Sequence, residues 1–407
     1  MTSAALNLRV LAMAPVLVLG PALTCAIPRV MAPLFIISAV LTIIADCWMR
    51  KSRPEASKPF LALFGAMLAF GAVSYLWTVN PDDTFSKVAQ LAGIFLPMTF
   101  LMPVLGRMNE EELKRLGVYA ATGLVLGVAV FLLERFSNFA LYDGLRGGFT
   151  TDVIDNKQNK AIVLLAMWAY IVFAFARKTW AKIALAVFAV LLAKLTYDSP
   201  SGSAKLILAT VPLFVAFLMI VPVRISAVLT FVMTSFLVIA MPFMAHQIAT
   251  KTQWPTSTVL NSSMKSRVEI WDQGARRAFE KPIAGWGLDS APLIPNRSEM
   301  SYTGKNYIHH MHPHNGAIQI WEEMGLIGVA MTCVLFFLFY TRICTLSSTK
   351  AQRYAVFMWG TVFAYTLSIW GLWQTWFMAT LVFMGVMTWA GARYIETSDT
   401  TQNKTAA

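Results

Sequence analysis

The sequence predicts an all-α integral membrane protein of about 12 transmembrane helices, because apolar runs of about 20 residues recur along most of the chain. Of the 407 residues, 57% are hydrophobic and the mean hydropathy is +0.59, which is too apolar for an ordinary soluble protein. Basic and uncharged loops alternate between the runs. Together these observations predict a multi-pass helical bundle with a fixed orientation.

Each predicted span must be a helix, because lipid offers no hydrogen-bond partner to backbone N–H and C=O groups. The expected divisions are nine spans within residues 1–246, a loop domain at 247–314, three spans within 315–392 and a polar, disordered tail at 393–407. The predicted spans lie at residues 9–27, 30–48, 59–77, 87–106, 117–134, 160–177, 181–197, 204–221, 224–246, 315–341, 355–372 and 374–392.

The distribution of lysine and arginine between the loops predicts that both termini are cytoplasmic. The loops on the opposite side, "TVNPDDTFS" (78–86) and "DSPSGS" (198–203), contain neither residue. The net charge of +12 is therefore largely a topology signal and requires no nucleic-acid partner. The basic loops are "RKSRPEASK", "GRMNEEELKR", "RKTWAK" and "RICTLSSTKAQR".

Two long loops are expected on the non-cytoplasmic side, at residues 135–159 and at 247–314. Lys87 and Lys205 lie near the outer ends of their spans, on the same side. An ionisable group at such a depth either marks a functional site or extends its side chain to the interface. The polar residues thus collect at one face of the membrane.

Within the larger loop, "NSSMKSRVEIWDQGARRAFEKP" predicts an amphipathic helix. Ser262 or Ser263 can cap it and Pro282 ends it. Arg267 and Trp271 are four residues apart and share a face. The same pattern is also typical of a helix that only lies on the membrane surface or on the bundle. In that case Arg267 is a solvated charge without a catalytic role.

Four of the five histidines stand within six residues, in "HHMHPH". His310 and His314 have the i, i+4 spacing of a helical zinc site, but Pro313 between them breaks a helix. No cysteine is near. A metal site is therefore disfavoured, and His309, His310 and His312 are equally compatible with polar residues at a membrane interface.

His314 differs from the other histidines because it stands at the start of the tenth predicted span. Backbone N–H groups at a helix start are unpaired and the helix dipole is positive there, which favours a neutral imidazole. A neutral imidazole is what a general base requires. Asn315 can cap the same helix.

His314-Asn315, nine further residues and then Gly325-Leu326-Ile327-Gly328 resemble the H-[NSQ]-x9-G-x-x-G signature of O-antigen ligases. "SRVEIW", with Arg267, resembles the family's loop arginine. The resemblance implies a GT-C-like fold and an inner-membrane enzyme whose site faces the periplasm. It also implies a metal-independent, cofactor-free, inverting transfer of a polysaccharide from undecaprenyl diphosphate to a sugar hydroxyl of lipid A core.

In this family role His314 is the base, and arginine stabilises the diphosphate leaving group through its planar, permanently charged fork. Arg267 is the first candidate and Arg146, flanked by glycines, is the second; Lys87 and Lys205 add charge. The sequence departs from many relatives at "DSPSGSAK", where they carry a Ser-Arg pair. The remaining candidates for substrate binding are Asn315, Trp271 and His312.

Several other functions compete with this one. An O-antigen polymerase or a protein-glycosylating oligosaccharyltransferase of the same superfamily has a similar topology, although the histidine signature favours a ligase. A lipid or solute transporter is expected to show repeated halves and polar residues at the bilayer midplane, and neither pattern is evident here. A purely structural membrane protein has no need of cations and a histidine on one face.

Overall fold

The computed structural model describes residues 7–137, 140, 143–144, 151–198, 202–260, 262–294, 312–367 and 370–406. These residues are almost entirely helical and include no strand. The helices are α1 (Leu8–Ala26), α2 (Met31–Arg50), α3 (Lys58–Val73), α4 (Pro81–Gly106), α5 (Glu110–Phe136), α7 (Thr151–Phe175), α8 (Thr179–Asp198), α9 (Gly202–Ile220), α10 (Val223–Lys251), α11 (Ser262–Glu280), α12 (Gly316–Cys344), α13 (Thr349–Thr366) and α14 (Thr375–Ala406).

Each predicted span corresponds to one helix, and α11 is the predicted amphipathic helix of the large loop. In the described part of the chain, nine helical segments are long and apolar enough to cross a membrane, and Ala161–Phe175 and Ala209–Ile220 are shorter apolar stretches. The all-α membrane fold is confirmed.

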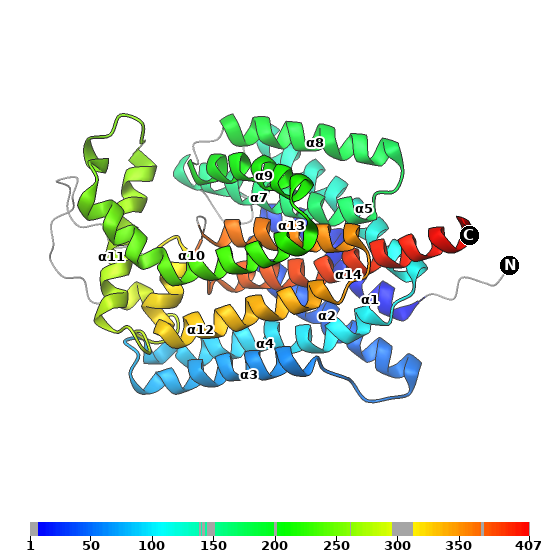
Figure 1. Ribbon diagram of the computed structural model, residues 1–407, viewed down its shortest axis with the longest axis horizontal. Coiled ribbons are helices and arrows are strands. Elements are labelled where there is room, and N and C mark those ends of the chain that lie inside the picture. Colours follow the sequence, from blue (N-terminus) through cyan, green and yellow to red (C-terminus); the bar gives the residue numbers. More distant parts are fainter. Residues whose placement is uncertain are drawn as a thin grey trace.

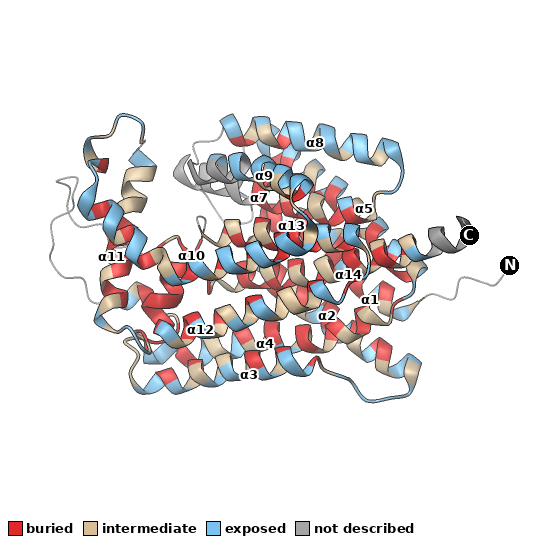
Figure 2. Ribbon diagram, in the orientation of Figure 1, coloured by how far each residue is buried: buried red, intermediate tan, exposed pale blue. Residues whose placement is uncertain are grey.

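The helices run side by side, and α11 lies at one end of the bundle with the end of α10 and the start of α12 (Figure 1). Both chain termini lie at the opposite end (Figure 1). α14 is central and packs against α2, α4, α5, α7 and α13. Buried residues are concentrated along the middle of the bundle, whereas α8 is largely exposed, as a lipid-facing apolar helix is expected to be (Figure 2).

Several helix boundaries differ from the sequence-based expectation by six residues or more. α7 begins at Thr151, inside the predicted loop 135–159, and α13 ends at Thr366 rather than near residue 372. The tail expected to be disordered instead continues α14 to Ala406. Hydrophobicity ends before the helix does, and polar contacts hold the extension: Ser348 Oγ donates to Asp399 Oδ2 (2.6 Å).

Candidate active site

α12, which follows the histidine segment, is broken near its start at Gly325. The dihedral angles there, φ 58° and ψ −154°, lie in a region that is open essentially only to glycine. The break leaves backbone carbonyls before Gly325 and backbone amides after it without partners inside the helix. The sequence predicted one continuous span over 315–341, so this break corrects the prediction.

The loop that directly follows α11, residues 282–287, supplies the missing partners. Its backbone inserts beside α12 and exchanges hydrogen bonds on both sides of Gly325, so the large loop and the broken span form one unit. The four bonds run from Trp286 N–H to the Glu322 carbonyl (2.9 Å), Gly287 N–H to the Glu323 carbonyl (2.9 Å), Leu326 N–H to the Pro282 carbonyl (2.8 Å) and Ile327 N–H to the Ile283 carbonyl (3.2 Å).

The start of α12 is capped as the sequence predicted. The Asn315 side chain accepts hydrogen bonds from the amides of Ala317 (3.0 Å) and Ile318 (3.2 Å). Its buried Nδ2 has no hydrogen-bond partner in the described part of the chain. His314, just before the cap, has φ 52°, a left-handed conformation that is uncommon for a residue with a side chain. The chain therefore turns sharply at the candidate base.

His312 and His314 lie against each other at this turn. Their ring centroids are 4.2 Å apart and the rings are inclined by 68°. Gln374, from the connection between α13 and α14, places its Nε2 atom 3.2 Å from His312 Nε2. Both histidines are half-buried. The structure thus joins the histidine segment to a loop that the sequence assigned to two membrane spans.

α11 packs against α10 and α12 rather than lying separately on a membrane surface. A Cβ atom added to Gly274 would lie 2.6 Å from Ile318 and 3.4 Å from Pro313, so this face is turned to the start of α12. Arg267 stands seven residues, about two turns, before Gly274 and shares its face. Trp271 packs into the small cluster that contains Ile318, so its side chain also faces the start of α12.

Arg267 is half-buried, and burial lowers the pKa of its guanidinium. A guanidinium remains charged at neutral pH even so, and the poorer solvation strengthens its attraction for an anion. The indole N–H of Trp271 is buried and has no hydrogen-bond partner in the described residues. The face of α11 that meets the start of α12 at Gly274 therefore also carries a cation and a donor, about two turns and one turn earlier in the helix.

The other charged residues of α11 make structural contacts. Asp272 Oδ1 accepts from His246 of α10 (2.7 Å), and its Oδ2 lies 2.9 Å from Arg276 Nε in an ion pair. Arg277 Nη1 lies 2.9 Å from Glu322 Oε1, and both side chains are buried. These pairs tie α11 to α10 and to the first part of α12.

Lys87 lies between the loop after α11 and the connection between α13 and α14. Its Nζ atom is 3.1 Å from Asp289 Oδ2 and donates to the Trp373 carbonyl at 3.2 Å. Burial raises the pKa of Asp289, and the nearby Lys87 offsets part of that rise. Lys87 is therefore already paired, as well as being a candidate for contact with a ligand.

Of the four remaining sequence candidates, one lies on α9 and three lie outside the described residues. Lys205 is exposed at the start of α9, where its ammonium lies 5.5 Å from the centroid of the Tyr197 ring. Arg146, His309 and His310 lie outside the described residues.

Sequence reasoning missed three residues that hold the site together: Gln374, Asp289 and Gln319. Gln319 Nε2 donates to Glu323 (2.9 Å) while its Oε1 accepts from the Leu372 amide (2.7 Å). Their positions inside or next to apolar runs could have identified them, because a polar residue at such a place often has a function. An analysis based on hydropathy treats them only as interruptions of a span.

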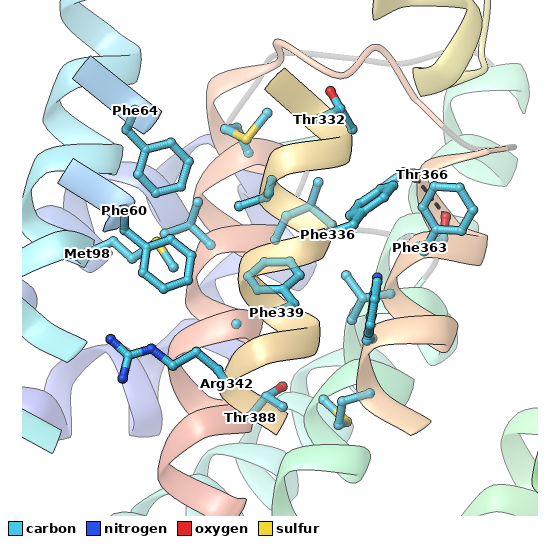
Figure 3. A pocket seen from close by; sticks show the side chains of 18 of the residues that line it. Phe60, Phe64, Met98, Thr332, Phe336, Phe339, Arg342, Phe363, Thr366 and Thr388 are labelled. Atoms are coloured by element: carbon cyan, nitrogen blue, oxygen red, sulfur yellow. Dashed lines mark hydrogen bonds between the residues drawn. The ribbon is translucent and has the colours of Figure 1, made fainter. Parts of the chain in front are cut away.

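An apolar slot runs between α3, α4, α12, α13 and α14, with a volume of about 230 Å³ (Figure 3). Phe60 and Phe64 line one side and Phe336 and Phe339 another (Figure 3). Arg342 stands at the end away from the histidines. At the histidine end the lining residues are Gly316, Ala317, Leu372 and Trp373.

In the described part of the chain, no three His, Cys, Asp or Glu side chains are grouped as metal ligands. His312 and His314 have each other and the α13–α14 connection as neighbours. The expectation of a metal-independent reaction stays a prediction.

The O-antigen ligase family model matches residues 162–333. The resemblance to the O-antigen ligase family is confirmed. This O-antigen ligase match includes α11, the histidine turn and the break of α12. It ends before the α13–α14 connection that carries Gln374.

Curated relatives agree with the O-antigen ligase match. A Rickettsia conorii protein named "Putative polysaccharide ligase" is 24% identical over 332 residues, covering 80% of this chain and 77% of the relative. A Rickettsia bellii protein of the same name is 22% identical over 322 residues, covering 77% and 76%. A third, from Rickettsia felis, is 23% identical over 332 residues, covering 80% and 78%.

Proposed function

We propose that this chain transfers a polysaccharide from undecaprenyl diphosphate to a sugar hydroxyl of lipid A core, with inversion and without a metal ion. The single observation that carries the proposal is the histidine turn at the start of α12. This turn lies between α11 and the loop of Gln374, beside one end of the apolar slot.

The chemistry divides between a base and a cation. His314 takes the proton of the acceptor hydroxyl as its oxygen attacks the anomeric carbon of the donor sugar. The bond between that carbon and the phosphate oxygen breaks with inversion, and the electron pair leaves with the lipid diphosphate. The proton then passes from His314 to solvent, so the base is regenerated.

Arg267 holds the diphosphate as its charge develops. A guanidinium in a partly dehydrated position stabilises a phosphate oxyanion more strongly than one in water. Its place on the face of α11 turned to α12 supports this role. Lys87 contributes positive charge, moderated by Asp289. Arg146 remains a candidate for the same task.

The apolar slot suits the prenyl chain of the donor. Its lining is almost entirely aliphatic and aromatic, and its end at Gly316, Ala317 and Trp373 adjoins the histidine turn. A chain seated there directs the diphosphate to that end. The slot is the feature that supports a lipid-linked donor over a soluble one.

The orientation belongs to the proposal as well. Arg50, Arg107, Arg177 and Arg342 lie at the end of the bundle that carries both termini (Figure 1). By the excess of positive charge in inner loops, that end faces the cytoplasm. The histidine turn then faces the periplasm of a bacterial inner membrane.

The test uses purified protein, a glycan on undecaprenyl diphosphate and lipid A core, with EDTA present throughout. Wild type is expected to transfer, while His314→Ala and Arg267→Ala lose activity by a factor of about 100 or more with unchanged thermal unfolding. Lys114→Ala, which removes an exposed cation from the start of α5, is the matched control and is expected to remain active. Activity abolished by EDTA, or full activity in His314→Ala, contradicts the mechanism.

The acceptor is tested separately. The same donor is offered with lipid A core, with a second lipid-linked glycan, or with an acceptor protein. Transfer only to lipid A core supports the ligase. Transfer only to a lipid-linked glycan identifies a polymerase, and transfer only to protein identifies an oligosaccharyltransferase.

A further inference from the structure

The connection between α13 and α14 holds the His312 ring in place. A Cβ atom added to Gly371 would lie 2.8 Å from His312 Cδ2 and 2.9 Å from Cγ, so only glycine leaves room for the ring. Gln374 Nε2 lies 3.2 Å from His312 Nε2. The ring is therefore fixed from one side by backbone and at its edge by an amide.

The hydrogen-bond direction at this edge follows from Trp376. Its indole N–H can only donate, and it lies 2.9 Å from Gln374 Oε1. That contact assigns the oxygen of the Gln374 amide, so the atom turned to His312 is the NH2 group, which also can only donate. His312 Nε2 must then accept, and the single ring proton of His312 is on Nδ1.

This arrangement has an electrostatic consequence for His314. An imidazolium carries N–H groups on both nitrogens and cannot accept from Gln374, so the contact disfavours a charged His312. The His314 ring lies 4.2 Å away, centroid to centroid. A charged ring at that distance opposes proton uptake by its neighbour, whereas a neutral ring does not.

We propose that Gln374 is a positioning residue for the transfer reaction. Fixed by Trp376, it holds His312 as a neutral Nδ1–H imidazole packed against His314, which leaves His314 able to take the acceptor proton. Gln374 does not touch the substrate in this scheme. The inference rests on the proposed function through the role of His314.

The elements packed around this turn carry further charged groups. They are Arg267 and Arg277 on α11, Glu322 and Glu323 on α12, Lys87 on α4 and Asp289 in the loop after α11. The variant used to test Gln374 must therefore leave all of them in place.

The first measurement requires no turnover. Protein labelled with 15N-histidine is placed in lipid bilayers, and the His312 signals are identified by their loss in His312→Gln; the chain has only five histidines. In wild type, the His312 signals are expected to be those of a neutral ring with the proton on Nδ1 across the neutral pH range. A proton on Nε2 in wild type overturns the proposal.

The second measurement uses Gln374→Glu, which keeps size and shape but reverses the hydrogen bond. A carboxylate accepts, so His312 is expected to carry a proton on Nε2 and to become charged more readily. The expected result is a kcat at least about 10-fold lower, an acid limb of the pH profile moved to higher pH, and an unchanged KM. A purely structural role tolerates this isosteric change, so an unchanged kcat and pH profile overturn the proposal.

The control is Gln90→Glu, the same change on α4 at a side chain that contacts Thr375 at the start of α14. It is expected to leave both the histidine signals and kcat unchanged. If His314→Ala retains activity while the His312 signals are as expected, the proposed function fails and the proton assignment of His312 stands. The two failures are thus distinguishable.

Discussion

Gly325 of α12 lies so close to Ile283 that a Cβ atom at position 325 would be 2.5 Å from the Ile283 carbonyl carbon and oxygen. The left-handed φ of Gly325 adds a second constraint. The first glycine of the family-like G-x-x-G pattern is therefore explained by the entry of the large loop beside the broken helix.

Gly325→Ala is expected to destabilise the protein. The backbone conformation alone costs about 1–3 kcal/mol for a residue with a side chain, and the clash with Ile283 adds to it. Gly65→Ala in α3 is the matched control, because nothing lies within 4 Å of the added atom. Thermal unfolding in detergent should show a lower midpoint for the first variant only; equal midpoints contradict the account.

The buried pair of Arg277 and Glu322 gives a second prediction. Their 2.9 Å contact joins α11 to the first part of α12. Arg277→Ala leaves Glu322 buried without its cation, which typically costs 3–5 kcal/mol. Unfolding is expected to occur at a clearly lower temperature or denaturant concentration.

A double variant serves as the test of cause. Arg277→Met with Glu322→Gln removes both charges and should recover part of the lost stability. Lys114→Ala, whose partner Glu111 is exposed, is expected to change stability by less than about 1 kcal/mol. If the double variant is no more stable than Arg277→Ala, an unpaired Glu322 is not the cause.

Much of this architecture was predictable from sequence. Spans and the amphipathic helix follow from hydrophobic runs and periodicity, and the Asn315 cap follows from its place before a helical run. The break at Gly325 was not predictable from sequence, because apolar residues continue across it. Only the tertiary contact with Ile283 reveals the need for glycine.

The site was predictable only in part. His314 and Arg267 were found through their motifs and their helical positions. Gln374 was missed because an uncharged amide beside apolar tryptophans carries no motif, and because its partner His312 is 62 residues away in the chain. Long-range pairing of this kind is a property of packing rather than of local sequence.

Asp289 gives a prediction on pH. Its folded pKa is raised above the ordinary 3.8 by burial, so ionising it costs more in the folded state than in the unfolded state. The stability contribution of this group is full below the ordinary pKa and is lost as pH rises through the folded pKa. Asp289→Asn can still accept from Lys87 and lacks this titration.

The unfolding midpoints of wild type and Asp289→Asn are compared from about pH 4 to pH 8. The midpoint of the variant should rise relative to that of wild type as pH rises. A difference that is constant with pH would show that Lys87 compensates fully for burial. A difference that moves in favour of wild type would show a lowered folded pKa.

The proposed orientation predicts the labelling of a native cysteine. Cys344 is exposed at the end of α12, on the side of both termini. A membrane-impermeant maleimide should therefore modify it in inside-out vesicles and not in intact spheroplasts. Cys344→Ser is the control for labelling at the other three cysteines. Labelling in intact spheroplasts would invert the topology.

Arg267 and Arg276 allow a matched comparison on one helix. Arg267 shares the face of Gly274, which meets Pro313 and Ile318 at the start of α12, whereas Arg276 pairs with Asp272 beside α10. Lysine keeps the charge but loses the planar fork that binds two phosphate oxygens. Arg267→Lys is therefore expected to lower kcat/KM for the lipid diphosphate donor by roughly 10-fold or more, and Arg267→Ala by about 100- to 1000-fold.

Arg276→Lys makes the identical chemical change away from the histidine turn and is expected to leave kcat/KM within about 2-fold of wild type, since lysine still pairs with Asp272. Binding of undecaprenyl diphosphate alone, measured by displacement, distinguishes the origin of the loss. Weaker binding in Arg267→Lys places the contact in the ground state as well as in the transition state. Equal losses for both lysine variants would mean that α11 contributes only through its fold, and would move the diphosphate contact to another cation such as Arg146.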